Sequence, residues 1–294
     1  MKSELVLAFS VGGGSPPATS ELLRIYQDGR AVALVGNAWP EGQPQDEAGL
    51  YAMQLLPAEL EYIKRFLAEE RIFALEAEYG PLRMDSGFNT LQLFGEGCAA
   101  KIKWGPFAKI PNSLRELRAH LRGILLKTRQ QPVQTVQVEL GMASAQPVLA
   151  GASWPIEFKI SNRGTQPVRV QMAGGEVTSS LGDSASALRF YTVPVGEKAE
   201  GTATDAPPPL EYLYYAQAVT PDNPADLQLL GSMAELAPGA TWRVCAVVPC
   251  PSGGAGPYSL YGFTEPRIEV ILDGKLLTVE CFIVTRPVII EQVG

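Results

Sequence analysis

Histidine is almost absent from this chain, which has one, His120, among 294 residues. Ser-His-Asp and Cys-His catalysis both need an imidazole beside the nucleophile, and many protein zinc sites use histidine ligands. Each of these would have to use His120, which lies in a predicted helix, where we expect a solvated or partly packed imidazole. A Gly-x-Ser-x-Gly nucleophile elbow is also missing. Histidine-dependent hydrolysis and histidine-based zinc chemistry are therefore not expected.

Cysteines and long apolar runs are scarce as well. The four cysteines are Cys98, Cys245, Cys250 and Cys281, and their spacing, with no nearby histidine, is a poor zinc signature. We expect all four thiols to be reduced and to pack as small apolar side chains. The apolar run from Leu5 to Phe9 is too short for a signal sequence or a membrane span. These features predict a cytoplasmic protein without a membrane segment.

The triplet Gly12, Gly13 and Gly14 resembles part of a phosphate-binding loop only superficially. No Gly-Lys-Ser/Thr follows it, and Pro16 and Pro17 would interrupt the helix that such a loop opens. Carboxylates are numerous, but no pattern pairs two of them for acid–base chemistry. We expect a protein that is not an enzyme and holds no cofactor or metal. An enzyme with an unrecognised carboxylate site stays open as an alternative.

Charge is distributed unevenly along the chain. The net charge is −7, which argues against a general nucleic-acid binder. Residues 98–131 carry eight Lys/Arg and one acid, which makes the segment +7 and leaves −14 for the remainder. We interpret the segment as the solvated face of one strand and one helix, and a surface for an acidic partner is the alternative. Beyond Trp104 and Phe107 no aromatic residues interleave with these charges, so RNA or DNA is not an expected partner.

Residues 1–131 predict an α+β domain, an antiparallel sheet with two helices. Asp28-Gly29 predicts a two-residue type I′ hairpin turn. Pro57 is a favoured first residue for one helix. Ser113 and Glu116 form a capping-box pattern at the start of the other. The expected strands are residues 5–9, 22–27, 30–35, 49–55, 88–94 and 98–104.

Gln130-Gln131-Pro132 predicts a linker, and residues 132–294 predict an all-β sandwich. There apolar residues alternate with period 2 in many short segments separated by turn signals, one of them Asp273-Gly274. This alternation is absent between residues 196 and 238, where we expect a long insertion. Residues expected to face the core include Trp154, Ile156, Phe158, Ile160, Val168, Val170, Val244, Ala246, Ile268 and Val270.

The first half resembles a known inhibitor family in the order of its segments. A first strand leads into Ser10-Val11-Gly12-Gly13-Gly14, a helix runs into Ile72-Phe73-Ala74-Leu75, and a late strand pair precedes Ile110-Pro111 and a terminal helix. This order is similar to emfourin-type domains, small α/β inhibitors of thermolysin-like metalloproteases. That family has a Ser-Gly-Gly-type segment at the first position, from which this chain departs by inserting Val11. The resemblance implies an intracellular protease inhibitor.

The second half resembles bacterial immunoglobulin-like modules. The likeness lies in Val148-Leu149-Ala150-Gly151, Ile160-Ser161-Asn162-Arg163-Gly164 and Leu236-Ala237-Pro238-Gly239. It departs from antibody domains because the predicted strand over residues 154–160 has no cysteine for an inter-sheet disulfide. A sandwich of this widespread type implies fold more than function.

The favoured function is a protein-binding module with two candidate surfaces. The first is the glycine-rich loop made of Val11, Gly12, Gly13, Gly14 and Ser15, whose backbone can lie close against another surface. A metalloprotease is the partner that the family resemblance implies. The second surface comprises Tyr212, Tyr214 and Tyr215 in the insertion. A structural or accessory subunit that uses the sandwich as an adaptor stays open, and the sequence does not indicate an oligomeric state.

Overall fold

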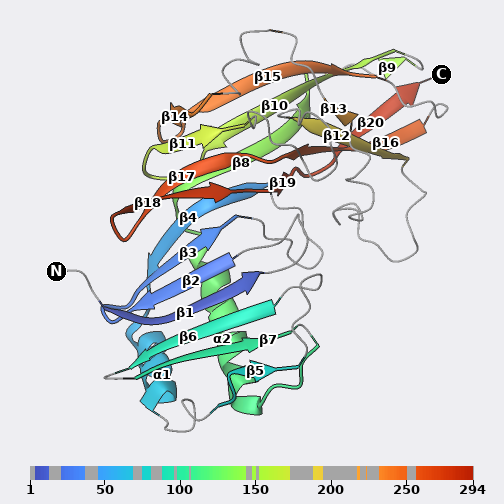
Figure 1. Ribbon diagram of the computed structural model, residues 1–294. Coiled ribbons are helices and arrows are strands. Elements are labelled where there is room, and N and C mark those ends of the chain that lie inside the picture. The colour runs from blue at the N-terminus through green and yellow to red at the C-terminus, as the bar shows by residue number, and fades with distance from the viewer. Residues whose placement is uncertain are drawn as a thin grey trace. The chain divides into compact units, whose positions relative to one another are not determined.

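The chain is largely β, with two helices and several sheets in its described part (Figure 1). The computed structural model describes residues 4–12, 21–36, 46–68, 75–80, 88–95, 98–105, 107–143, 148–149, 152–172, 188–194, 217–218, 223, 232–249 and 256–293. Two compact units are present, and neither is one continuous stretch. The first comprises residues 1–38, 49–133 and 272–275, and the second comprises residues 39–48, 134–271 and 276–294.

The first unit contains a sheet with the strand order β4-β3-β2-β1-β6-β7-β5. Neighbouring strands are antiparallel except β5 and β7, which are parallel. The strands are β1 (Leu5–Gly12), β2 (Glu21–Tyr26), β3 (Arg30–Val35), β4 (Glu47–Gln54), β5 (Glu78–Tyr79), β6 (Phe88–Gly95) and β7 (Cys98–Trp104). The two hairpins expected in this half, β2–β3 and β6–β7, are both formed.

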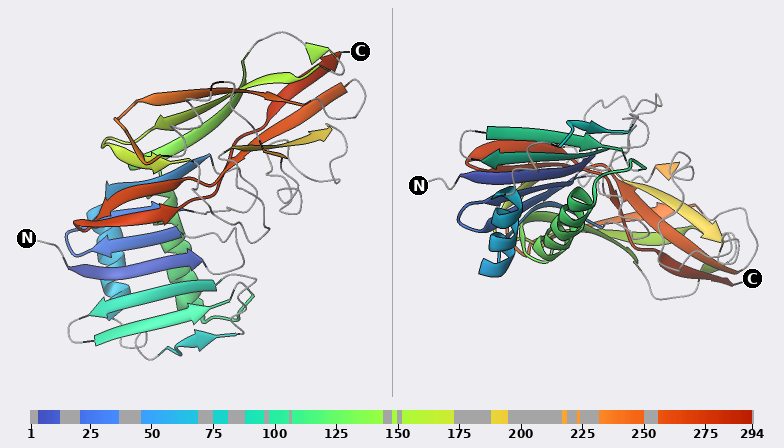
Figure 2. Two further views of the ribbon diagram at one scale, coloured as in Figure 1. Left: turned by 45° about the horizontal axis from the view of Figure 1, so that its top comes forward. Right: turned by 90° about the horizontal axis from the view of Figure 1, so that it is seen from below.

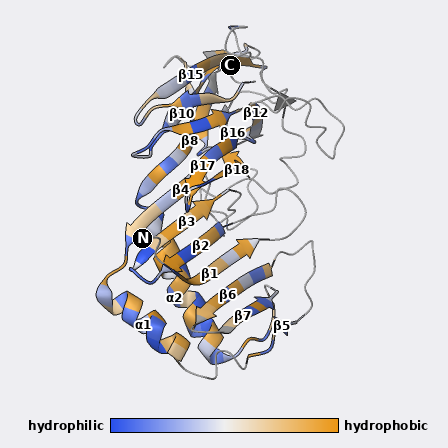
Figure 3. Ribbon diagram, turned by 60° about the vertical axis from the view of Figure 1, so that its left-hand side comes forward, coloured by the Kyte–Doolittle hydropathy of each residue, from blue (hydrophilic) through white to orange (hydrophobic). Residues whose placement is uncertain are grey.

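Two helices, α1 (Pro57–Ala68) and α2 (Asn112–Thr128), cover one face of this sheet (Figure 2). The predicted stripe of α2, namely Leu114, Leu117, Leu121 and Ile124, is buried. It belongs to one apolar core with alternate residues of the strands, such as Leu7, Leu23 and Leu91. The hydrophobic colour of β1 to β3 in Figure 3 reflects this burial. The period of 3.6 in the helix and of 2 in the strands therefore brings their apolar faces together.

The capping box predicted for α2 is not formed. The N-cap residue is Pro111, and no side chain caps the helix by a hydrogen bond. Because the helix begins at Asn112, Ser113 already lies inside the first turn. From there its hydroxyl cannot take the N-cap role that the sequence pattern assigned to it.

The Asp28-Gly29 prediction is also wrong in its turn type. The loop has three residues, 27–29, and Gly29 (φ +83°) has positive φ while Asp28 does not. The Gly29 N–H donates to the Tyr26 carbonyl (2.9 Å), and the Arg30 N–H donates to Asp28 Oδ1 (3.0 Å). The aspartate therefore stabilises a longer turn that ends in a left-handed glycine. Asp273-Gly274, in contrast, has positive φ at both residues, as a two-residue type I′ turn requires.

The second unit consists of three groups of paired strands. The first has the order β15-β10-β8, the second β14-β11-β17-β18, and the third β13-β12-β16-β20-β9, with β19 also paired to β16. Their bounds are β8 (Pro132–Met142), β9 (Val148–Leu149), β10 (Trp154–Asn162), β11 (Val168–Gln171), β12 (Arg189–Pro194), β13 (Gln217–Ala218), β14 (Ala234–Leu236), β15 (Thr241–Val248), β16 (Gly256–Thr264), β17 (Arg267–Leu272), β18 (Lys275–Glu280), β19 (Ile283–Val284) and β20 (Val288–Val293). Most of the predicted insertion, residues 196–238, lies outside the described residues.

Two of these strand groups approach each other closely through β10 and β16. The predicted alternation of β10 is present, with Trp154, Ile156, Phe158 and Ile160 buried. The Trp154 ring lies 5.6 Å from that of Tyr258 on β16. At Gly262, also on β16, a Cβ atom would lie 2.7 Å from Phe158 Cε1. The glycine therefore makes room for the phenylalanine, and a larger residue there would force the strands apart.

A buried amide, Asn162, joins the ends of three segments in the second unit. Its Nδ2 donates to the carbonyls of Gln166 and Leu236 (both 2.9 Å), and its Oδ1 accepts from the Gly164 N–H (2.8 Å). The Gly239 N–H donates to the Asn162 carbonyl (3.0 Å). This side chain thus connects the turn after β10 to the strand β14. Both lie in segments that carried the resemblance to immunoglobulin-like modules.

We predict that Asn162→Ala lowers the free energy of unfolding by about 2–4 kcal/mol, because three hydrogen-bonding partners lose their bonds in or near a buried site. Urea denaturation measures the loss. Ser161→Ala is the control, since Ser161 Oγ bonds Thr241 Oγ1 at an exposed position and should cost less than about 1 kcal/mol. Equal losses in the two variants would contradict the role assigned to Asn162.

Candidate functional site

One end of the first sheet brings together the ends of three strands, β1, β6 and β7. Val11 and Gly12, the last residues of β1, pair with Asn89 and Phe88, the first residues of β6. On β7, Trp104 pairs with Asn89. We call these five residues the β1 end of the sheet. Neighbouring strands are about 4.8 Å apart, so the ends of β1 and β7, with β6 between them, are separated by about 10 Å.

Two of the five residues predicted for the glycine-rich contact loop lie at the β1 end. Val11 and Gly12 belong to β1, which continues three residues past the predicted end at Phe9. The strand is longer than predicted because β1 is paired on both sides, with β2 and β6. These partners satisfy backbone groups that a loop would leave to water. Gly13, Gly14 and Ser15 lie outside the described residues, as do Tyr212, Tyr214 and Tyr215.

Next to the β1 end, Phe107 is 94% exposed, more than any other large apolar side chain in the described part of the chain. It follows Trp104 in a short turn in which the Ala108 N–H donates to the Gly105 carbonyl (3.2 Å). The Gly105 N–H in turn donates to the Tyr79 carbonyl of β5 (3.4 Å). A fully exposed phenylalanine therefore stands on a turn that is fixed to the sheet.

Sequence reasoning noted Phe107 only as an aromatic residue among basic ones. The signal that could have found it is local. Phe107 lies in the connection from β7 to α2, residues 105–111, where no helical or strand period assigns it to a core; Ile110 is the other large apolar residue there.

The residues beneath the β1 end are buried. Trp104 stacks on Phe9 with ring centroids 6.2 Å apart, and both side chains are buried. Asn89 is buried as well. Within the described residues, Asn89 Oδ1 and Trp104 Nε1 have no hydrogen-bond partner. Buried groups of this kind are rare in proteins, so the edge combines a fixed apolar floor with unsatisfied polar groups.

The basic segment 98–131 is used in part within the first unit. Arg129 and Arg122 lie 3.1 Å and 3.9 Å from the buried Glu21, and Lys127 lies 2.6 Å from Glu59. These three cations pair with acids of the same unit. That pairing agrees with the interpretation of the segment as helix and strand faces, and it leaves fewer charges for an acidic partner.

His120 packs against Tyr62 on α1, with ring centroids 4.4 Å apart. Burial lowers the pKa of His120, and the nearby charge of Glu59 opposes this shift. The imidazole is therefore a packing group between the helices. No three His, Cys, Asp or Glu side chains in the described ranges are grouped so as to hold a metal ion. Among the same residues, no helix has the length and apolarity to cross a membrane. Cys245 and Cys281 are both free thiols, and Cys281 is buried as expected. Cys245 is exposed, so the expectation that it packs as a small apolar side chain is wrong.

The densest charged cluster of the first unit surrounds Asp273, in the turn 272–275 that belongs to this unit. Its carboxylate accepts from Arg24 Nη1 (2.7 Å) and from the Tyr26 hydroxyl (2.7 and 2.6 Å to its two oxygens), and Arg30 Nη2 lies 3.4 Å away. The Arg30 guanidinium also lies 4.0 Å from the centre of the Tyr26 ring. The groups around the carboxylate bind it from several sides, so the cluster is structural.

The same contacts shift both acids. Burial raises the pKa of Asp273, but the hydrogen bonds from Tyr26 and Arg24 and the arginine charges outweigh it, so this pKa is lowered overall. Burial and the hydrogen bond to Asp273 raise the pKa of Tyr26 to about 12. A lowered folded-state pKa means that Asp273 stabilises the fold above its unfolded value, near pH 4, and that this stabilisation is lost as pH falls through the folded value.

We predict that Asp273→Asn costs about 2 kcal/mol at pH 6, where the carboxylate is charged, and less at pH 2. Asparagine tolerates the positive φ of this position, so the substitution tests the charge rather than the turn. Unfolding midpoints between pH 6 and pH 2 provide the measurement. The wild-type midpoint should fall more steeply than that of the variant, and parallel curves would contradict the assigned pKa direction.

Comparisons with known proteins do not place this chain in a family. No family model matches the sequence, and no curated protein matches it significantly.

Proposed function

We propose that this chain is a protein-binding module and that its contact surface is the β1 end of the first sheet together with Phe107. The observation that carries the proposal is the 94% exposure of Phe107 on a fixed turn. Leaving a phenylalanine in water forgoes on the order of 2 kcal/mol of burial free energy. Aromatic side chains are enriched at protein interfaces, where a few of them contribute most of the affinity.

The rigidity of the surface supports the same function. Val11 and Gly12 are held by β2 and β6, and the Phe107 turn is hydrogen-bonded to β5. A surface that is ordered before binding loses little conformational entropy when a partner docks, so more of the contact energy appears as affinity. The glycine at the end of β1 also adds no side chain that would keep a partner away from the backbone.

The class of partner is proposed from the resemblance of the first half to emfourin-type domains. A cytoplasmic metalloprotease of the thermolysin type is the partner that this likeness favours, with the chain acting as its inhibitor. For the second unit, the alternating strands, the Trp154–Tyr258 contact and the close approach at Gly262 support an immunoglobulin-like sandwich.

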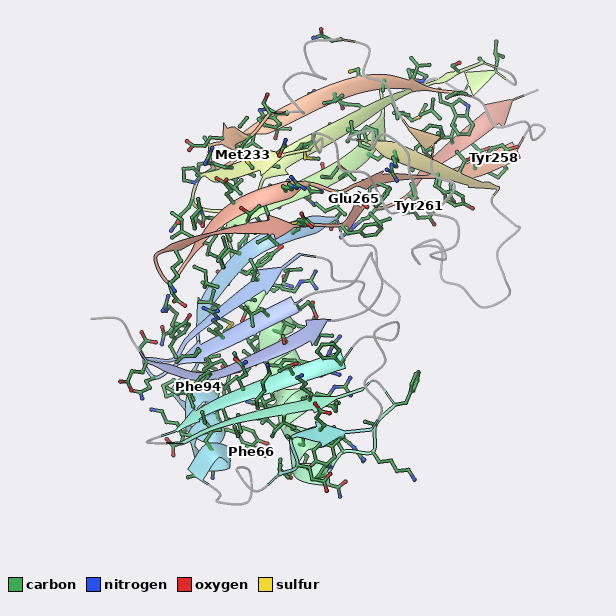
Figure 4. All side chains as sticks on the ribbon, viewed as in Figure 1. Phe66, Phe94, Met233, Tyr258, Tyr261 and Glu265 are labelled. Atoms are coloured by element: carbon green, nitrogen blue, oxygen red, sulfur yellow. The ribbon has the colours of Figure 1, made fainter. Side chains whose placement is uncertain are left out.

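We predict that Phe107→Ser weakens partner binding at least tenfold, about 1.4 kcal/mol, with an unchanged unfolding midpoint because the side chain is exposed. The control is Phe94→Ser, because Phe94 is 38% exposed on β6 at the opposite end from Phe88 (Figure 4). Wild type and both variants are immobilised, and the proteins retained from native cytoplasm are quantified by mass spectrometry.

A protein retained by wild type and by Phe94→Ser, but lost with Phe107→Ser, is the expected result. If every retained protein binds all three forms equally, the surface is wrong. Inhibition of purified thermolysin tests the partner class separately. An inhibition constant that rises at least tenfold in Phe107→Ser supports it, and no inhibition by wild type contradicts it.

A further inference from the structure

In the second unit, the strand group β15-β10-β8 has a long edge strand, β15, that pairs on one side only within the described residues. Within the described residues β15 is hydrogen-bonded to one strand, β10, and Figure 1 shows it as the outermost strand of the group. The pairing is continuous over eight residues, from Thr241 opposite Ser161 to Val248 opposite Trp154. The other edge strands described in this unit are shorter: β9 and β13 have two residues, β14 three and β18 six.

This edge has few of the features by which proteins block strand pairing. Natural edges are short, bulged, interrupted by proline, covered, or lined with charged side chains. β15 has no proline, glycine or bulge. Its one charged residue, Arg243, lies 3.5 Å from Glu157 of β10, which also lies 3.4 Å from Lys159. Cys245 and Val247 are exposed on the same face, Val247 by 47%.

We infer that β15 pairs with β15 of a second copy of this chain, antiparallel and about a two-fold axis. Such an axis stands perpendicular to the sheet, so that residues directly opposite each other point to the same face. The backbone groups on the open side of one β15 then bind those of the other. Three residues near the middle of the strand could lie on the axis.

The side chains select one of these three registers. An axis at Arg243 would place two like charges directly opposite, which is unfavourable. An axis at Cys245 would place Thr241 opposite Pro249, which has no N–H to donate. An axis at Val244 avoids both, because it pairs Thr241 with Val247 and Arg243 with Cys245. In this register the exposed Val247 is covered by the copy, and the strand group β8-β10-β15 continues across the axis into its repeat.

Val247→Lys tests the interface. Its side chain points to solvent in the single chain, so the variant should keep the wild-type unfolding midpoint. In the dimer the introduced ammonium group would lie diagonal to Arg243 of the copy, where like charges repel. Sedimentation velocity of the full chain, from low micromolar to several hundred micromolar, should show a reversible wild-type dimer whose dissociation constant rises at least tenfold in the variant.

The matched control is Ile289→Lys, because Ile289 is 55% exposed on β20, which pairs with β16 at this residue and with β9 at Gln292 and Val293. It should leave the dimer unchanged, as should Phe107→Ser, which separates this inference from the proposed function. For the register, Arg243→Cys should crosslink to Cys245 of the copy under mild oxidation. A wild-type chain that stays monomeric, a dimer that tolerates Val247→Lys, or a crosslink that fails to form would each overturn the inference.

Discussion

The pairing of β1 on both sides is the constraint on which the first unit depends. β1 is central in the sheet, and its hydrogen bonds to β2 and β6 fix the register of Leu7 and Phe9, which are buried under the helices. The same register carries Val11 and Gly12 to the β1 end, where Val11 lies opposite Asn89, which the pairing of β6 with β7 sets opposite Trp104. A one-residue slip would turn the buried residues to the other face, so the edge is as well determined as the core.

In the second unit, a steric fit between two strands and the hydrogen bonds of one amide side chain hold the strands in register. Gly262 leaves space for Phe158, and Asn162 hydrogen-bonds segments that are distant in sequence. The strand group that contains β10 packs on its inner face, whereas its last strand, β15, pairs on one side only within the described residues. The two proposed interaction surfaces therefore differ in kind: one depends on an exposed aromatic side chain, and the other on free backbone groups.

Several elements could be predicted because they depend on short-range patterns. The alternation of Trp154, Ile156 and Phe158, the stripe of α2 and the start of α1 at Pro57 each follow from the period of one element. Local signals failed where an adjacent residue or a paired strand decided the boundary. Pro111 occupied the cap position that the Ser113 pattern claimed, and β2 and β6 extended β1 beyond Phe9. Asp28-Gly29 and Asp273-Gly274 have the same sequence but form different turns.

By itself, the sequence determined both helices and many of the strands, which of their faces are apolar, and that histidine-dependent catalysis would have one residue to use, but it did not predict strands such as β12, β16 and β20. The tertiary structure alone decided which strand ends meet at the β1 end, that Phe107 stays exposed beside it, and that β15 is an edge. The physical reason is that the spacing of apolar residues along one segment indicates whether that segment is a helix or a strand and which face is apolar. Strand order and exposure depend instead on contacts between residues far apart in the chain. Those contacts have no signature in a single sequence.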